Sequence, residues 1–316
     1  MSFEFLREGR VWLEYPTNTF TLLHTTKDIS FSQTFKQESS KRNTLHNPDQ
    51  FFSRSTIKEA NPASFSFTMY MIKEPSINQN KLLDLLLNYS VDPTYTLDTF
   101  TLYFVYENYS PQVYYKLENC VMSSGSFNIP RNGLMTVGLS GEASKLSRVF
   151  GSNIWNVNPH LGYVDFPEYA ISKAFEVYVG GTSSTYKLDN IMGASFEVQN
   201  SIEWTRNSTL QDSLAVTDET NTIFPAFFTL EGRSFAGSIE QYIDQTKSMS
   251  RNNILTWSEG TTVNIKAGLA TNNFQLEILL ENNASFTNRS NFGEVFSQNY
   301  DFKLIANPLI SNVFNY

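Results

Sequence analysis

Alternating apolar and polar residues mark the clearest elements of this 316-residue chain. In residues 28–35 (DISFSQTF), serine and threonine alternate with isoleucine and phenylalanine, and residues 64–72 (SFSFTMYMI) show the same pattern. A period of two is typical of a β-strand with one face packed on a core and the other facing water. We therefore predict strands at 21–35 and 64–72, each with one polar face.

The period changes to that of an α-helix in residues 76–89. Leucines recur there at helical spacing, and Ser76 follows Pro75 as a possible amino-terminal cap. In this half of the chain we predict strands at 9–15, 21–35, 64–72, 99–107, 112–122 and 134–142. The polar connection 36–62 is much longer than an ordinary loop, which favours a functional role.

The second half shows the same order of elements more loosely. We predict strands at 174–180, 186–199, 226–239, 261–268, 272–281 and 299–307. A second helix is expected within 240–256, and a second long polar loop at 200–224. Residues 143–172, which contain two prolines and two glycines, are expected to link the halves.

Two segments recur between the halves. Residues 30–45 (SFSQTFKQESSKRNTL) align with 195–210 (SFEVQNSIEWTRNSTL) at an offset of 165, and 116–128 align with 275–287 at an offset of 159. The matches occur in the same order, as expected of a tandem duplication with a short deletion. We therefore expect two domains, residues 1–150 and residues 151–316.

Composition supports a β-rich fold and argues against a phosphate-gripping surface. Aromatic residues make up 15% of the chain and charged residues only 17%, which suits half-buried strands. The net charge of −8 is uneven, because residues 1–150 hold 14 basic and 14 acidic residues whereas 151–316 hold 9 and 17. No cluster of lysine and arginine offers the basic face that nucleic-acid binding requires.

No segment carries the signature of catalysis or of cofactor binding. The three histidines are not spaced as metal ligands, and neither a nucleophile elbow nor a phosphate-binding loop is present. We therefore expect no enzymatic activity, no metal and no cofactor. The single cysteine, Cys120, excludes an internal disulfide and is expected to be buried. No apolar run approaches the length of a membrane span.

Tyrosines crowd one predicted hairpin, and two interpretations of them remain open. These residues are Tyr103, Tyr106, Tyr109, Tyr114 and Tyr115. Packing between antiparallel strands is the simpler interpretation. Exposed rings could instead stack on sugars, which would favour a carbohydrate-binding protein.

The segments 3–15 (FEFLREGRVWLEY), 27–35 and 60–71 (ANPASFSFTMYM), together with the repeat, resemble the major tail tube protein of long-tailed bacteriophages, in its duplicated form. The resemblance implies two tandem antiparallel β-sandwich or barrel domains, each with one flanking α-helix and a long loop between strands 2 and 3. It implies a structural virion protein of the tail, assembled in the host bacterial cytoplasm. Three copies would form a pseudo-hexameric ring, and stacked rings would form the hollow tube that conducts DNA to the host.

The resemblance also implies partners and sites. The partners would be further copies of this chain, a tape-measure protein, a tail terminator and distal tail proteins, while DNA would pass without specific binding. Polar strand faces would line the lumen, with the candidates Ser30, Ser32, Thr34, Ser66, Thr68, Ser195, Glu197, Gln199, Ser238 and Glu240. The long loops would contact the adjacent ring, with the candidates Lys41, Arg42, Phe51, Phe52, Arg54, Trp204 and Arg206.

Two alternatives remain at this point. A β-rich adhesin or carbohydrate-binding module would use the tyrosine cluster and stay outside any ring. A phage tail-tip or baseplate protein built from the same domain would form one ring without polymerising.

Overall fold

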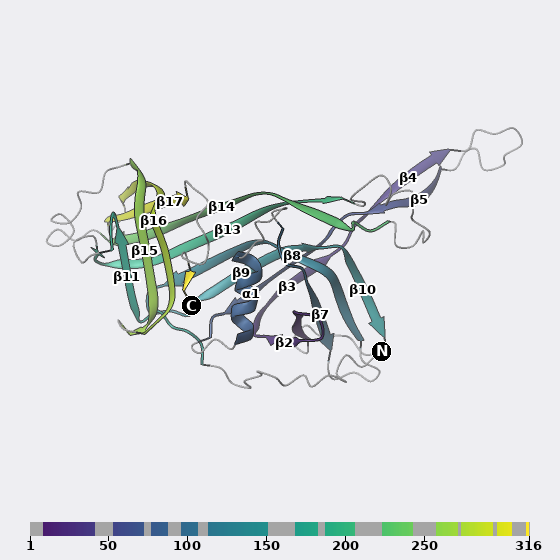
Figure 1. Ribbon diagram of the computed structural model, residues 1–316, viewed down its shortest axis with the longest axis horizontal. Coiled ribbons are helices and arrows are strands. Elements are labelled where there is room, and N and C mark those ends of the chain that lie inside the picture. The colour runs from purple at the N-terminus through teal and green to yellow at the C-terminus, as the bar shows by residue number, and fades with distance from the viewer. Residues whose placement is uncertain are drawn as a thin grey trace, which may run out of the picture.

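The computed structural model is mainly β, as the alternating pattern predicts, with a single short helix in the part that it describes (Figure 1). The described residues are 9–41, 53–72, 77–87, 96–106, 113–150, 168–182, 187–205, 223–242, 257–270, 273–292, 296–304 and 314–315. Their strands form a 16-stranded sheet and a separate two-stranded sheet, with antiparallel pairing. They do not close into a barrel within one chain.

The first half holds the strands β1 to β10 and the helix. The strands of its main fold are β1 (Gly9–Glu14), β2 (Phe20–Leu23), β3 (Thr25–Ser32), β6 (Ala63–Tyr70), β7 (Phe100–Tyr106), β8 (Val113–Pro130), β9 (Thr136–Ala143) and β10 (Lys145–Phe150). Helix α1 spans Ile77–Leu87, inside the predicted range. The strands are paired in the order β2, β1, β7, β8, and then through β9 and β6 to β3.

The second half repeats this order of pairing. Its strands are β11 (Ala174–Val179), β12 (Lys187–Leu188), β13 (Ile191–Thr205), β14 (Phe227–Tyr242), β15 (Trp257–Ala270), β16 (Asn273–Phe292), β17 (Phe296–Leu304) and β18 (Phe314–Asn315). They are paired in the order β12, β11, β15, β16, and then through β17 and β14 to β13. Each strand of this path thus takes the place of one in the first half, which is the order that a tandem duplication would produce. The domain boundaries themselves stay a prediction.

The two halves join through strands β8 and β13. Residues 124–130 of β8 pair with 199–193 of β13, so that Phe127 lies opposite Phe196. The junction creates one continuous sheet, which we call the central sheet, in the order β3, β6, β9, β8, β13, β14, β17, β16. In Figure 1 the long strands β13 and β14 run between the two ends of the molecule.

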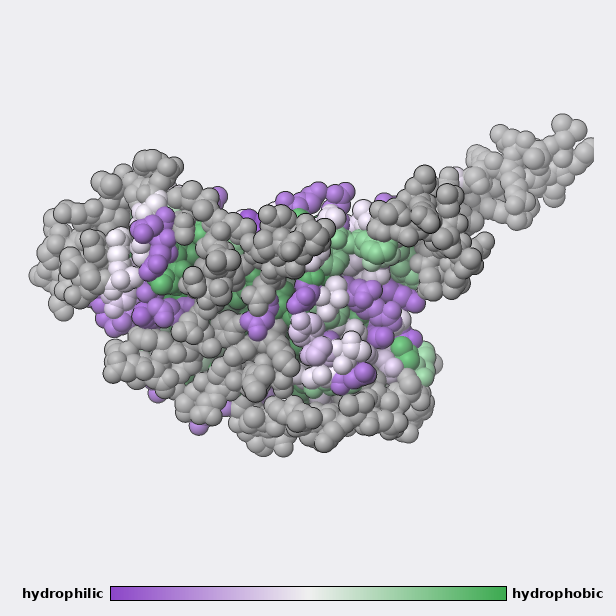
Figure 2. Space-filling view, viewed as in Figure 1, coloured by the Kyte–Doolittle hydropathy of each residue, from purple (hydrophilic) through white to green (hydrophobic). Residues whose placement is uncertain are grey.

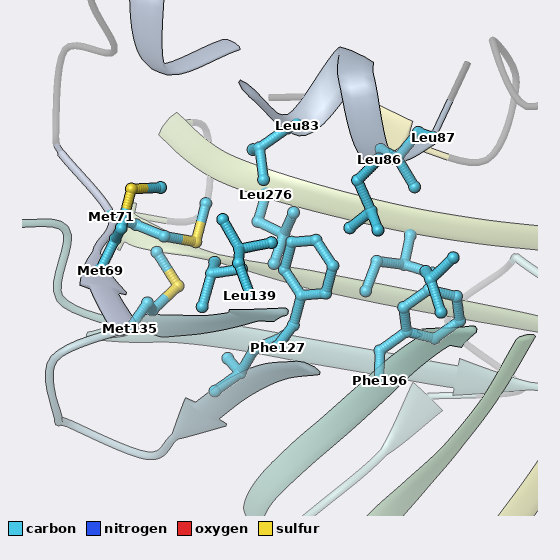
Figure 3. Packing of buried hydrophobic residues seen from close by; sticks show 14 of the residues in the cluster. Met69, Met71, Leu83, Leu86, Leu87, Phe127, Met135, Leu139, Phe196 and Leu276 are labelled. Atoms are coloured by element: carbon cyan, nitrogen blue, oxygen red, sulfur yellow. The ribbon is translucent and has the colours of Figure 1, made fainter. Parts of the chain in front are cut away.

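The apolar side of the central sheet is the core. Large side chains such as Phe67, Phe127, Phe196, Phe286 and Phe302 are almost fully buried there. Figure 3 shows Leu83 and Leu86 of α1 directed toward Phe127, Leu139 and Phe196. The approach of the helix is close, because a Cβ atom added at Gly125 would collide with the Leu86 side chain. The helix therefore packs across the junction of the two halves.

Several sequence-based boundaries are wrong. Residues 36–62 are not a plain loop, because β4 (Phe35–Lys41) pairs with β5 (Ser53–Ala60) in the two-stranded sheet. We call this hairpin the arm, since it projects away from the body (Figure 1). The linker predicted to start at residue 143 is also wrong at its beginning, because β10 pairs with β8 there. Local periodicity missed both pairings because the pattern of one strand does not determine its partner.

In the second half the strands extend beyond their predicted ends. β13 continues to Thr205, so the predicted loop 200–224 begins later, and β14 includes residues 240–242 of the predicted helix. The rest of the helix prediction, 243–256, lies outside the described residues.

Candidate functional site

The central sheet carries rows of polar side chains on the side opposite the core. One row is defined by successive strand pairing through Tyr70, Thr136, Asn128, Ser195, Ser238, Asp301 and Thr287. A neighbouring row runs through Ser30, Ser66, Ser140, Ser124, Gln199 and Ser234. Directly paired residues project on the same side of a sheet. We call the surface made by these rows the polar face.

All ten lumen candidates lie on the polar face or at its margin, although their role stays a prediction. Ser30 and Ser66 share a hydrogen bond of 2.8 Å between their hydroxyl oxygens, and Ser195 and Ser238 share one of 2.9 Å. The hydroxyls of Ser32 and Ser64 lie 3.0 Å apart. Equivalent strands of the two halves therefore hold the same side-chain contact.

The remaining candidates complete this surface. Thr68 lies in β6 opposite Gly138, and Glu240 lies in β14 opposite Asn299. Gln199 donates a hydrogen bond of 2.8 Å to Glu197, two residues away on the same face. Thr34 follows β3 and accepts a hydrogen bond of 2.8 Å from the Asn61 amide.

The polar face is hollowed over the second half. A depression of about 720 Å³ is lined by residues of β8, β13, β14, β16 and β17, among them Ser126, Glu197, Ser238, Arg289, Asp301 and Lys303. Arg289 forms an ion pair of 2.6 Å with Asp301. Because Ser126 of β8 also lines it, the depression reaches across the junction of β8 and β13.

The junction is held on its core side by a polar clamp on the end of α1. The guanidinium of Arg233 donates hydrogen bonds of 2.9 and 2.8 Å to the backbone carbonyls of Leu87 and Leu86, and one of 2.7 Å to Asn200 Oδ1. The buried Asn200 amide donates to the carbonyl of Met122 at 2.9 Å. A cation is favourable at a helix carboxyl terminus, where carbonyls lack intrahelical partners. Residues of the second half thus fix the helix of the first.

Sequence reasoning missed this clamp. Asn200 falls within the predicted loop 200–224, and Arg233 lies within an ordinary predicted strand. The only available signal is an arginine in the strand 226–239, whose partners could not be identified without the fold.

Exposed apolar residues occur in the arm, at Phe35 and Ile57, and at the start of β14, at Phe227. Phe35 is 42% exposed, Ile57 53% and Phe227 45%. Phe35 lies edge-on to Phe224 at 6.3 Å, and the amide of Ala60 donates to the carbonyl of Ile223 at 2.7 Å. Figure 2 shows hydrophobic residues reaching the surface where β13 and β14 approach the arm. Such a patch is typical of a surface that binds another protein.

The candidates for ring contact fall into three groups. Lys41 lies in β4 of the arm opposite Ser53, and Arg54 lies in β5 opposite Ser40. Trp204 is not in a loop, because it lies in β13 with its ring 5.4 Å from that of Phe228. Arg42, Phe51, Phe52 and Arg206 lie outside the described residues.

The tyrosine cluster favours packing over sugar binding where it is described. Tyr103 and Tyr114 are buried with ring centres 5.9 Å apart, and the Tyr103 hydroxyl donates to Glu14 at 2.5 Å. Burial and this carboxylate raise the pKa of Tyr103 well above its usual range. These rings present no open stacking surface, which weakens the carbohydrate-binding alternative.

Metal ligands and nucleophiles are the remaining groups of chemical interest. In the described part of the chain, no group of three or more histidine, cysteine or acidic side chains is placed to hold a metal ion. Cys120 is fully buried, and burial raises the pKa of its thiol. No helix within the described ranges has the length and hydrophobicity needed to cross a membrane.

Comparison with known proteins identifies a family. A sequence model described as the bacteriophage baseplate tube protein family matches residues 1–312. No curated protein matches the chain.

Proposed function

The chain belongs to the bacteriophage baseplate tube protein family, and from that premise we propose that three copies form a ring of the baseplate or tail tube through which DNA passes. It is a structural protein of the phage tail or baseplate, which places it in the virion. The description of the family supports a non-enzymatic role. Assembly would take place in the cytoplasm of the host bacterium.

The central sheet is the observation that carries this proposal. It presents one polar and one apolar side across strands from both halves. Open sheet edges tend to pair with other strands, and closing a sheet into a ring removes them. Three copies arranged around an axis would join their central sheets into one cylinder with the polar face inward. The duplicated pairing order would give that ring pseudo-sixfold symmetry.

The charges on the polar face suit passage of DNA without binding. Glu197, Glu240 and Asp301 are acidic and outnumber the cations Arg289 and Lys303 that line the depression, and Arg289 is neutralised in part by its ion pair with Asp301. Carboxylates on the wall repel phosphates within a Debye length of about 8 Å at physiological salt. The hydroxyl groups of the serine rows add polarity without a cation that would hold the phosphate backbone.

The arm supplies a contact between successive rings in this proposal. Its exposed Phe35 and Ile57, together with Phe227, would become buried against a neighbouring ring or another tail protein. The family description favours a baseplate ring over the major tail tube, which is a long stack. Tape-measure, terminator and distal tail proteins remain expected partners.

Electron microscopy of the purified protein, with mass measurement by light scattering, tests the proposal. We expect ring-shaped particles with the mass of three chains and a central hole. Stacked rings would identify a polymerising tube protein, and single rings a baseplate protein. A chain that stays monomeric at all concentrations, alone and with tail partners, would contradict the ring, and monomers that bind glycans would favour the adhesin.

A further inference from the structure

In the described residues, each end of the central sheet has a stretch of unpaired strand edge. Within the described residues, β3 pairs with β6 on one side only, and β16 beyond Thr287 pairs only with β17. Backbone groups along such edges readily pair with another strand. Inside the chain, the corresponding edges of β13 and β8 are paired with each other. The internal junction therefore serves as a template for how two copies could join.

The strand pairing identifies which positions of β16 correspond to those of β8. In the first half, Ser30 pairs through Ser66 and Ser140 to Ser124. In the second half, the equivalent Ser195 pairs through Ser238 and Asp301 to Thr287. Thr287 is thus the structural counterpart of Ser124.

A backbone feature supports the same correspondence. Asn119 and Asn282 both have a φ of 52°, the left-handed region that non-glycine residues seldom adopt. They precede Ser124 and Thr287 by the same number of residues. The bend in the long strand is therefore at the same place in both halves.

From these correspondences we infer that β3 of one copy pairs antiparallel with the edge of β16 in the next copy, in the register of the β8–β13 junction. This interface rests on the proposed ring. Ser195 lies opposite Asn128 and Glu197 opposite Ser126 inside the chain. The equivalent pairs between copies are Ser30 with Asn291 and Ser32 with Arg289.

A second register can be considered and is disfavoured. The sequence alignment of 116–128 with 275–287 would place Ser30 opposite Thr287. That position is already taken, because the backbone of Trp257 in β15 pairs with Thr287. Residues 288–292 are the part of this edge that β15 leaves unpaired in the described structure. The structural register therefore uses the open edge and requires no strand to be displaced.

The side chains agree with this register. Ser30 and Ser32 are exposed, and Arg289 is exposed on the polar face, so the pairs extend the polar rows from one copy to the next. On the other side, Phe31 is only half-buried, with its ring stacked on Phe104 at 4.4 Å. Pairing between copies would cover Phe31, as the internal junction covers Phe196.

Cysteine pairs test the register in the full chain. The variant S30C/N291C should form a disulfide between copies, because directly opposed antiparallel residues have Cα atoms about 4.5–5.5 Å apart, within disulfide range. After mild oxidation, denaturing gels without reductant should show covalent dimers and trimers that disappear on reduction. The native Cys120 is buried and should not interfere.

Two matched variants control this experiment. S195C/N128C reproduces the internal pair and should link within one chain, changing mobility without adding mass. S30C/T287C shifts the partner by four residues, about 13 Å along a strand, and should not link.

The outcomes separate the interface from the ring itself. Rings that form while S30C/N291C fails to link, or while S30C/T287C links instead, would overturn the inferred register and leave the ring intact. A wild-type chain that forms no rings would overturn the proposed function, and the interface with it.

Discussion

The strand pairs β3–β6 and β13–β14 make the same side-chain contact, but they differ in the strands that flank them. Both contain a serine pair with hydroxyl oxygens in hydrogen-bond contact, at 2.8 and 2.9 Å. Phe196 in β13 is only 1% exposed, however, whereas Phe31 in β3 is half-buried. The difference arises because β13 has a strand on each side and β3 has β6 alone in the described structure. The same alternating strand is therefore flanked on both sides in the second half and on one side in the first.

A second difference lies in the residues that come after the repeated strand. Asn200 aligns with Phe35 in the repeat, yet Asn200 is buried against α1 and Phe35 is exposed in the arm. One copy of the segment thus fastens the two halves together, while the other presents an apolar side chain at the surface. This contrast shows how one repeated segment can form an internal junction in one half and expose an apolar side chain in the other.

The largest expected effect compares the two phenylalanines. Phe196→Ala should lower the free energy of unfolding by about 3–5 kcal/mol, because it opens a cavity in a closed core. Phe31→Ala should cost about 1–2 kcal/mol, since less apolar area is buried there. Urea unfolding of both variants, at a concentration at which no rings form, measures the difference. Equal losses would contradict the idea that β3 is an incomplete edge.

The next effect tests the clamp that only the second half provides. Arg233→Ala should destabilise the chain by about 2–3 kcal/mol, because the carbonyls of Leu86 and Leu87 and the side chain of Asn200 lose a charged donor. Arg289→Ala, which removes an exposed ion pair, is the matched control and should cost less than about 1 kcal/mol. Thermal unfolding of the two variants should separate them, and similar melting temperatures would contradict the clamp.

The smallest effect tests whether the halves are packed alike. A Cβ atom at Gly141 would collide with the Phe65 ring, and one at Gly237 with the Phe302 ring. Each glycine-to-alanine change should cost about 1–3 kcal/mol through overpacking. Gly232→Ala meets nothing within 4 Å and should change stability by less than about 0.5 kcal/mol. Denaturant midpoints that differ strongly between Gly141→Ala and Gly237→Ala would show that the two halves are not equivalent here.

The sequence by itself determined most of the strands of the central sheet, the helix α1, and which side of these strands is polar. The alternation in β3, β6 and β13 depends only on neighbouring residues, because successive side chains project to opposite faces. The ten lumen candidates could therefore be assigned to polar strand faces before any pairing was known. The repeat similarly indicated a matching order of elements in the two halves.

Only the tertiary structure decided which strands are neighbours. The pairing of β8 with β13, the arm, and the contact of Arg233 with the end of α1 all join residues that are far apart in the chain. A strand edge carries the same backbone groups whatever its partner, so periodicity cannot specify the partner or the register. For the same reason, Phe31 and Phe196 look identical in the sequence, and the strand beside each determines how deeply it is buried.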